Sequence, residues 1–150
     1  MPAFCHEFMV DAPLRQVRDF HRYSASMGAL TPPPVMVQLH AAPDLLGEGD
    51  EMDFTLQVGP LPIRWQARIE QVSDTQFTDR QVSGPFRRWE HTHRFEAVSP
   101  FRTRVQDAIE IEYARQPLWR AVGWFMRLNL PLLFAYRGWK TRRLLARYPI

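Results

Sequence analysis

Two stretches of the chain decide its fold: RRWEHTHRFEA at residues 87–97 and RTRVQDAIEIEY at residues 102–113. In each, the side chains at every second position are mainly apolar or imidazole, and those between are mainly charged or polar. Because successive side chains of a strand point to opposite faces, this alternation predicts two β-strands with one buried face. The short connection at Ser99-Pro100 predicts that they pair antiparallel.

The same alternation continues on the N-terminal side. It predicts strands at residues 3–10, 35–39, 52–58, 63–69 and 75–83. Asp11 as N-cap, followed by Pro13 in the first turn, predicts a helix from about residue 12 to about Met27. After Pro117 the period becomes helical, to about Tyr148, and Pro131 should kink or split this helix. Its predicted inward stripe comprises Leu118, Val122, Phe125, Asn129, Leu132 and Tyr136. The order of elements predicts an α+β fold, an antiparallel meander closed by a long C-terminal helix.

The composition is that of a globular protein. The 150 residues are 45% hydrophobic and 23% charged, which excludes a disordered or fibrous chain and favours one domain over residues 1–150. A single cysteine, Cys5, excludes an internal disulfide framework. No apolar run approaches the roughly 18 residues of a membrane-spanning helix. The N-terminus lacks the basic and apolar regions of a signal peptide, so we expect a cytoplasmic protein.

Charge is distributed unevenly along the chain. Residues 114–150 carry eight Lys or Arg and no acidic residue, whereas residues 1–113 carry 11 basic and 16 acidic residues. Such a basic end favours an anionic partner or is simply a solvated face. Because Trp124 and Arg120 lie away from the inward stripe, we expect a peripheral contact with an anionic membrane or with a protein partner. Nucleic acid is not expected, since no recognition motif accompanies the basic residues.

Polar residues interrupt the predicted buried faces of three adjacent strands. They are Asp79, Gln81, His91, His93 and Asp107. A turn near Ser99-Pro100 places Asp107 opposite His93, or opposite His91 if the register slips by two, and a turn at Gly84-Pro85 places Asp79 and Gln81 across from the histidines. Cross-strand neighbours lie about 4.5–5.5 Å apart, so we expect carboxylate–imidazole hydrogen bonds. The set either fixes strand register as a satisfied polar network or orients a ligand in an apolar pocket.

Three stretches carry a family resemblance: GPLPIRWQARIE (59–70), GPFRRWEHTHRF (84–95) and LNLPLLFAYR (128–137). With the order of elements, they resemble the START/SRPBCC superfamily, in particular its small bacterial members of unassigned function and similar domains fused to NAD-dependent epimerase-like proteins. The resemblance implies the helix-grip fold, a curved antiparallel sheet of about seven strands wrapped around a long C-terminal helix. The superfamily includes lipid carriers, hormone receptors, aromatase/cyclases and quinone-binding proteins, so it implies a hydrophobic cavity and leaves the ligand open.

We therefore expect a carrier or sensor, without chemistry of its own, for a small and largely apolar lipid, quinone or aromatic, polyketide-like metabolite held between sheet and helix. The expected ligand-binding residues are Phe54, Trp65, Asp79, Gln81, Trp89, His91, His93, Asp107, Ile109, Phe125, Asn129 and Tyr136. One alternative is an acid–base enzyme of cyclase or dehydratase type, with His93 and Asp107 as the catalytic pair. The other is an interaction module that contacts a membrane surface or a protein through the basic, aromatic C-terminal helix.

No cofactor and no metal are expected. His91 and His93 supply two imidazoles on one face with carboxylates nearby, a set that suits zinc or iron. Their Cα atoms, however, lie roughly 6.6 Å apart along a strand, so both rings reach one ion only by leaning inward. A His-x-His pair alone is a weak indication of a metal site.

Overall fold

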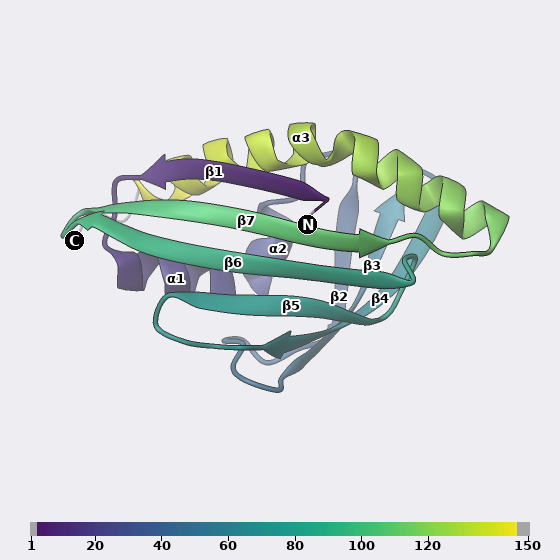
Figure 1. Ribbon diagram of the computed structural model, residues 1–150, viewed down its shortest axis with the longest axis horizontal. Coiled ribbons are helices and arrows are strands. Elements are labelled where there is room, and N and C mark those ends of the chain that lie inside the picture. The colour runs from purple at the N-terminus through teal and green to yellow at the C-terminus, as the bar shows by residue number, and fades with distance from the viewer. Residues whose placement is uncertain (1–2, 147–150) are drawn as a thin grey trace.

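The computed structural model describes residues 3–146, which form one sheet and three helices. In chain order the elements are β1 (Phe4–Val10), α1 (Leu14–Arg22), α2 (Ala25–Ala29), β2 (Met36–Ala41), β3 (Glu51–Val58), β4 (Leu61–Glu70), β5 (Gln76–Ser83), β6 (Arg88–Ser99), β7 (Arg102–Glu112) and α3 (Pro117–Leu145). The strands pair antiparallel in the order β1-β7-β6-β5-β4-β3-β2 (Figure 1). This arrangement confirms the predicted α+β class and the expected helix-grip architecture.

Tight connections keep consecutive strands side by side. The β3–β4 hairpin turns at Gly59, whose φ of 59° is accessible to glycine without steric cost. At the β6–β7 turn, Ser99 pairs with Arg102. From that turn the register runs through His93 opposite Asp107, which is the unslipped register that the sequence predicted.

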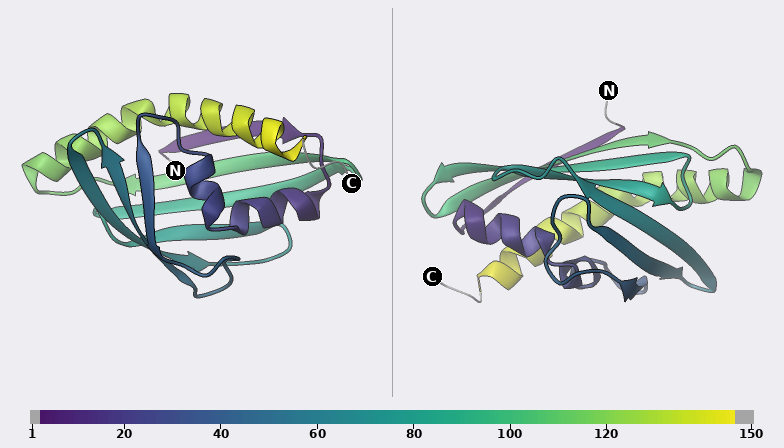
Figure 2. Two further views of the ribbon diagram at one scale, coloured as in Figure 1. Left: turned by 180° about the vertical axis from the view of Figure 1, so that it is seen from behind. Right: turned by 90° about the horizontal axis from the view of Figure 1, so that it is seen from below.

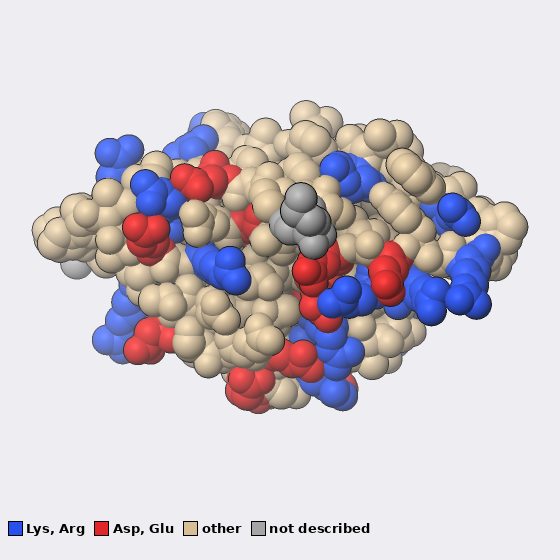
Figure 3. Space-filling view, in the orientation of Figure 1, with Lys and Arg blue, Asp and Glu red and all other residues tan. Residues whose placement is uncertain are grey.

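The sheet has one covered face and one accessible face. Along β6 and β7, buried and more accessible residues alternate, as period-two patterning requires. All three helices lie on the same, concave side of the bent sheet (Figure 2). The opposite, convex side carries acidic and basic side chains interspersed with one another (Figure 3). Functional groups that point to the concave side therefore lie between sheet and helices.

Helix α3 packs along β1 through a face of small and apolar residues. Its buried residues are Gly123, Leu130, Phe134, Gly138, Thr141 and Leu145. A Cβ atom on Gly123 would lie 3.1 Å from ring atoms of Phe86 and Tyr113, and one on Gly138 would lie 3.3 Å from the Phe8 ring. Each distance is tighter than an ordinary carbon–carbon contact, so the two glycines allow a close approach of helix to sheet at two separate points.

The helices agree with expectation only in part. The predicted helix at about residues 12–27 is two helices, α1 and α2, separated at Tyr23 and Ser24. At Pro131, where a kink or a split was expected, α3 is continuous and bends near its middle (Figure 2). Pro131 lies on the exposed side of the helix and has no N–H to donate to the carbonyl four residues earlier, which is a common cause of such a bend. The predicted helix end near Tyr148 lies outside the described residues.

The predicted inward stripe of α3 was wrong. Leu118, Phe125, Asn129 and Leu132 are exposed on the outer side of the helix, and Val122 and Tyr136 are half-buried. None of the described helices combines the length and apolarity that crossing a membrane requires.

Candidate functional site

The four predicted imidazole and carboxylate side chains meet on the concave face of the sheet. His91 and His93 come from β6, Asp107 from β7 and Asp79 from β5, and the register places Asp79 opposite His91. His91, His93 and Asp107 retain only 2%, 7% and 5% of their accessible surface. The Asp79 side chain keeps 29% and is the point at which these four residues, the His/Asp cluster, reach solvent.

Each imidazole of the cluster has one nitrogen near each carboxylate. Asp107 Oδ1 lies 2.8 Å from His91 Nε2, a hydrogen bond, and 3.5 Å from His93 Nδ1. Asp79 Oδ2 lies 4.0 Å from His91 Nδ1 and 3.8 Å from His93 Nε2. The two rings stack with centroids 3.8 Å apart. Asp107 therefore bonds to His91, although its backbone partner is His93, the residue that the sequence paired with it as a catalytic candidate.

Side chains from the helices cover the cluster. Phe134 of α3 meets the His91 ring edge to face at 5.4 Å, and the Arg137 guanidinium lies 5.5 Å from the centre of the Phe134 ring. On α1, the His21 ring lies 6.1 Å from that of His93, and its Nδ1 contacts the Val17 carbonyl at 2.8 Å. The sequence reasoning missed Arg137 and His21 as members of this site. The one signal for Arg137 is its position one helical turn after Phe134 on the closing helix.

The electrostatics of the cluster favour ionised carboxylates and an uncharged His93. Burial opposes ionisation of Asp107, but the His91 hydrogen bond and the nearby imidazoles outweigh it and lower its pKa to about 2. Burial, followed by the neighbouring His91, lowers the pKa of His93 to about 4. Burial also opposes ionisation of Asp79, yet its contacts with His93 and His91 lower its pKa. On the covering helices, burial lowers the pKa of His21 and of Arg137, and for Arg137 the two carboxylates act in the opposite direction.

Several buried polar atoms on the concave side have no hydrogen-bond partner among the described residues. They are His6 Nδ1, Trp65 Nε1, both ring nitrogens of His93, Arg137 Nε and Thr141 Oγ1. Roughly 90% or more of buried polar groups in folded proteins are paired, so a group of orphans on one face indicates a place for a bound molecule, ion or water.

The predicted apolar walls lie beside the cluster. Phe54 stacks on Trp65 at 5.9 Å, Trp65 meets Trp89 edge to face at 5.3 Å, and Ile109 is fully buried opposite His91. Towards the Gly59 end of the sheet, the concave-facing Leu56 and Val58 of β3 are only partly buried. The apolar lining therefore extends to a more accessible region between sheet and helix.

Four other predicted ligand residues lie away from the cluster. The Gln81 side-chain amide forms two hydrogen bonds with the backbone of Phe86: it donates to the carbonyl at 2.7 Å and accepts from the N–H at 3.1 Å. These bonds stabilise the β5–β6 connection. Phe125 and Asn129 lie on the outer face of α3, where Asn129 donates to the Phe125 carbonyl. The inward stripe was misplaced because the true inner face contains glycines and a threonine, so it is no more apolar than the outer face. Tyr136 is half-buried beside Trp139, with ring centroids 5.8 Å apart.

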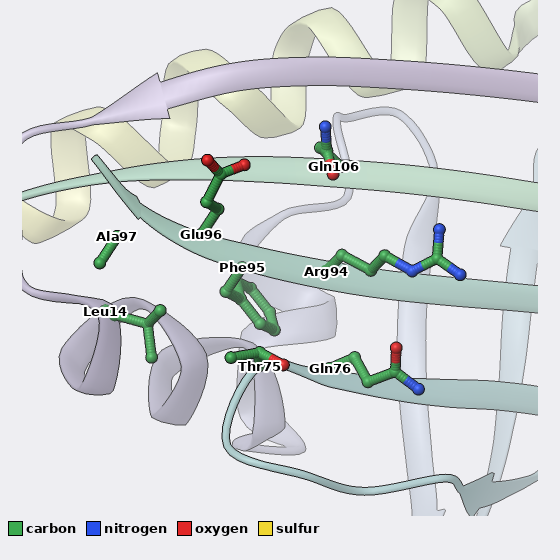
Figure 4. A pocket seen from close by; sticks show the side chains of 8 residues that line it. All are labelled: Leu14, Thr75, Gln76, Arg94, Phe95, Glu96, Ala97 and Gln106. Carbon is green, nitrogen blue, oxygen red and sulfur yellow. The ribbon is translucent and has the colours of Figure 1, made fainter.

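A hollow of about 430 Å³ lies elsewhere, at the end of β6 beside the start of α1 (Figure 4). Its walls include Arg94, Glu96 and Gln106, which alternate along β6 and β7 with the concave-facing residues. It contains none of the cluster residues. The candidate site is therefore the concave side, where the orphaned polar atoms and the apolar walls meet.

Comparisons with known proteins agree with this architecture. A family model described as polyketide cyclase / dehydrase and lipid transport matches residues 10–132. Protein Ms6760 from Mycobacterium smegmatis superposes with a TM-score of 0.70 at 12% identity, covering 97% of this chain and 91% of that one. Norcoclaurine synthase from Thalictrum flavum, in complex with dopamine and hydroxybenzaldehyde, gives 0.68 at 14%, covering 98% and 87%.

A third structure, the di-domain ARO/CYC BexL from the BE-7585A biosynthetic pathway, gives a TM-score of 0.66 at 19% identity, with 97% of this chain covering 47% of that one. A sequence comparison with curated proteins finds no match. At these identities the solved structures establish the fold, and the family model, which spans most of the chain, establishes the family. The chain belongs to the polyketide cyclase/dehydrase and lipid transport family, within the START/SRPBCC superfamily that its sequence resembles.

Proposed function

We propose that this protein binds a small, largely apolar molecule between the concave face of the sheet and α3, and carries or senses it. The observation that carries the proposal is the combination of aromatic walls with orphaned buried polar atoms, above all Trp65 Nε1. Pockets for small molecules are lined mainly by apolar and aromatic side chains, with a few polar groups that orient the ligand. The partly buried Leu56 and Val58 supply an apolar path from solvent.

The comparisons support the class of ligand. The family description includes lipid transport, and the norcoclaurine synthase structure holds two aromatic compounds. A lipid, a quinone or an aromatic metabolite would each match walls built from Phe54, Trp65 and Trp89. Binding without turnover is the simpler proposal because the catalytic candidates His93 and Asp107 are not hydrogen-bonded to each other.

A titration with the apolar fluorophore N-phenyl-1-naphthylamine tests this proposal. We expect saturable binding that Trp65→Ala weakens at least tenfold, because it removes most of one wall. Trp124→Ala, which changes a half-exposed residue of α3 that stacks on Tyr113, leaves the affinity unchanged. Trp65→Phe retains most of the ring and covers the case in which the alanine variant fails to fold. Absence of saturable binding, or equal losses in the Trp65 and Trp124 variants, would overturn the proposal. Conversion of a bound metabolite to a new product would indicate the enzymatic alternative instead.

A specific surface favours a second function, docking on an anionic membrane. Seven apolar residues of α3 recur at alternating spacings of three and four and are all exposed: Leu118, Ala121, Phe125, Leu128, Leu132, Ala135 and Trp139. Leu128 and Leu132, near the centre of this outer ridge, are 72% and 71% exposed. A ridge of this kind lies readily in the interface of a lipid bilayer.

Charge decides which partner fits the outer ridge. Helix α3 carries six basic residues and no acidic residue, and three of the six, Arg120, Arg142 and Arg143, are exposed. A second copy of this helix would bring like charge against like charge, whereas anionic lipid headgroups would neutralise the arginines beside the ridge. We therefore propose that the outer ridge contacts an anionic bilayer surface, where a carrier would collect or deliver an apolar molecule.

Co-sedimentation with vesicles tests the membrane contact. We expect binding to phosphatidylcholine vesicles that contain phosphatidylglycerol, weak binding to pure phosphatidylcholine, and loss of binding at high salt. The double variant Leu128→Ser/Leu132→Ser should lose at least tenfold in vesicle affinity, and Phe101→Ser, which changes an exposed aromatic residue at the β6–β7 turn, should not. Sedimentation of the free protein as a dimer that the double variant dissociates, without vesicle binding, would contradict the membrane contact.

A further inference from the structure

The His/Asp cluster has a geometry that a polar network alone does not explain. His91 Nδ1 and His93 Nε2 both point towards one oxygen of Asp79, at 4.0 and 3.8 Å, too far for hydrogen bonds. The three atoms lie within 4.8 Å of one another. The opposite ring nitrogens both face Asp107. Asp107 thus lies close to one nitrogen of each imidazole, at 2.8 and 3.5 Å. Asp79 faces the other nitrogen of each ring from the opposite side, at the longer distances of 4.0 and 3.8 Å.

We propose that Asp79, His91 and His93 bind a divalent transition-metal ion through Oδ2, Nδ1 and Nε2, and that Asp107 is the carboxylate that orients both rings. Metal-ligating imidazoles usually donate their other N–H to a carboxylate or carbonyl, which fixes the tautomer. The 2.8 Å bond from His91 to Asp107 is such a contact. His93 meets Asp107 at 3.5 Å and tightens this contact when its ring tilts.

The distances are close to what coordination demands. Metal–nitrogen and metal–oxygen bonds of about 2.0–2.2 Å in a tetrahedral site place neighbouring ligand atoms roughly 3.3–3.6 Å apart. Asp79 Oδ2 must therefore move by only a few tenths of an ångström relative to each ring nitrogen. The stacked rings must also splay, because an ion between them cannot lie in both ring planes at their present angle of 28°.

The donor atoms of the cluster suit a transition-metal ion, and its unpaired nitrogens and negative charge favour a bound cation. Two imidazoles and one carboxylate suit zinc, cobalt or ferrous iron better than the oxygen-seeking magnesium or calcium. Both ring nitrogens of the buried His93 lack a hydrogen-bond partner among the described residues. Arg137 acts electrostatically on both carboxylates, and it forms no ion pair with either within residues 3–146. A cation would neutralise the remaining negative charge.

This inference revises the expectation of no metal, which rested on the separation of the histidine Cα atoms. In the structure the rings lean together, to a centroid distance of 3.8 Å. The fourth coordination position would open on the side where Asp79 reaches solvent. The metal site does not depend on the apolar ligand proposed above, because its three protein ligands suffice to hold the ion and the fourth position is open to solvent.

Metal titration of the full chain tests the site. After removal of bound metal with a chelator, Co²⁺ should bind at one equivalent with visible d–d absorption, and Zn²⁺ should displace it. Asp79→Asn and His93→Gln should each weaken Zn²⁺ binding at least tenfold. Asp107→Asn should weaken it roughly 10–100-fold, as expected for a second-layer carboxylate. His40→Asn, which changes an exposed histidine outside the cluster, should bind as the parent does.

Circular dichroism of each variant separates lost binding from lost fold. Asp79 is the most accessible cluster residue, so Asp79→Asn keeps the test decisive if His93→Gln does not fold. Absence of saturable binding of either metal would overturn the proposal. Binding that survives Asp79→Asn unchanged, or that is lost in His40→Asn or in Cys5→Ser, would overturn it as well. Apolar-probe affinity, measured separately, shows which of the two sites has failed.

Discussion

Asp79 and Arg80 are neighbours in β5 that point to opposite faces of the sheet, and their surroundings differ completely. On the convex side, Arg80 lies 2.9 Å from Glu70 in a cross-strand pair in which each side chain is about one-third exposed. On the concave side, Asp79 faces two imidazoles with which it makes no hydrogen bond shorter than 3.5 Å. The carboxylate of Glu70 is thus paired, whereas that of Asp79 has no hydrogen bond to another side chain of residues 3–146.

This difference between the two faces indicates which charged residues have a functional role. Convex pairs such as Arg64–Asp53 and Arg68–Glu51 match one cation with one acid in contact with water, where such pairs contribute little stability. The concave cluster places two carboxylates in a buried region, where desolvation is costly unless every charge and lone pair is met. A cluster that bears this cost without complete pairing is better explained by something it binds than by the stability it adds.

The largest expected effect concerns the cover over the cluster. Phe134→Ala should lower the free energy of unfolding by about 3–5 kcal/mol, because it opens a cavity against His91 and Phe4. Leu132→Ala, two positions away on the outer ridge, should change it by less than about 0.5 kcal/mol. Urea unfolding followed by tryptophan fluorescence measures both. Equal losses would mean that the two faces of α3 are not distinguished as described.

An intermediate effect is expected for the buried hydrogen bond. Asp107→Asn preserves the shape of the side chain but weakens the bond to His91, and should destabilise the protein by about 1–3 kcal/mol. Glu110→Gln on the accessible face of the same strand is the matched control, with an expected change below about 0.5 kcal/mol. If Glu110→Gln lost as much free energy of unfolding as Asp107→Asn, the concave and convex faces of β7 would not differ in the way described.

The smallest effect is expected on the convex side. Arg80→Gln should cost about 0.2–1 kcal/mol, and this cost should shrink in 1 M salt, where charges are screened beyond about 3 Å. The measurement is the difference in unfolding midpoint between parent and variant at low and high salt. A cost above 2 kcal/mol that salt does not alter would show that the convex ion pairs are structural supports.

The sequence predicted the sheet and the cluster well because both follow from a period of two and from short turns. From Ala97 opposite Thr103 inward, counting residues places Asp107 opposite His93. Next to the turn, where Ser99 pairs with Arg102, the register shifts by one residue, and this irregularity is not visible in the alternating pattern. Counting could not reveal that Asp107 bonds to His91, because register places Cα atoms and side-chain rotation decides which ring reaches the carboxylate.

The helix was harder to predict for a physical reason. Helix α3 is apolar on both faces, so its hydrophobic pattern does not mark the side that meets the sheet, and Phe125 and Asn129 were placed inward wrongly. Arg137 and His21 join the cluster only through the way α3 and α1 pack over the sheet. Contacts that depend on tertiary packing between distant elements have no local signature in the sequence.

The two glycines of α3 have a consequence for the spacing between helix and sheet. Gly123 and Gly138 act as spacers at the places where the helix touches Phe86, Tyr113 and Phe8. A methyl group at either position would press against an aromatic ring and increase the distance between that part of the helix and the sheet. The spacing between helix and sheet at these two points is therefore set by residues outside the His/Asp cluster, so substitutions there would alter the spacing while leaving the cluster residues unchanged.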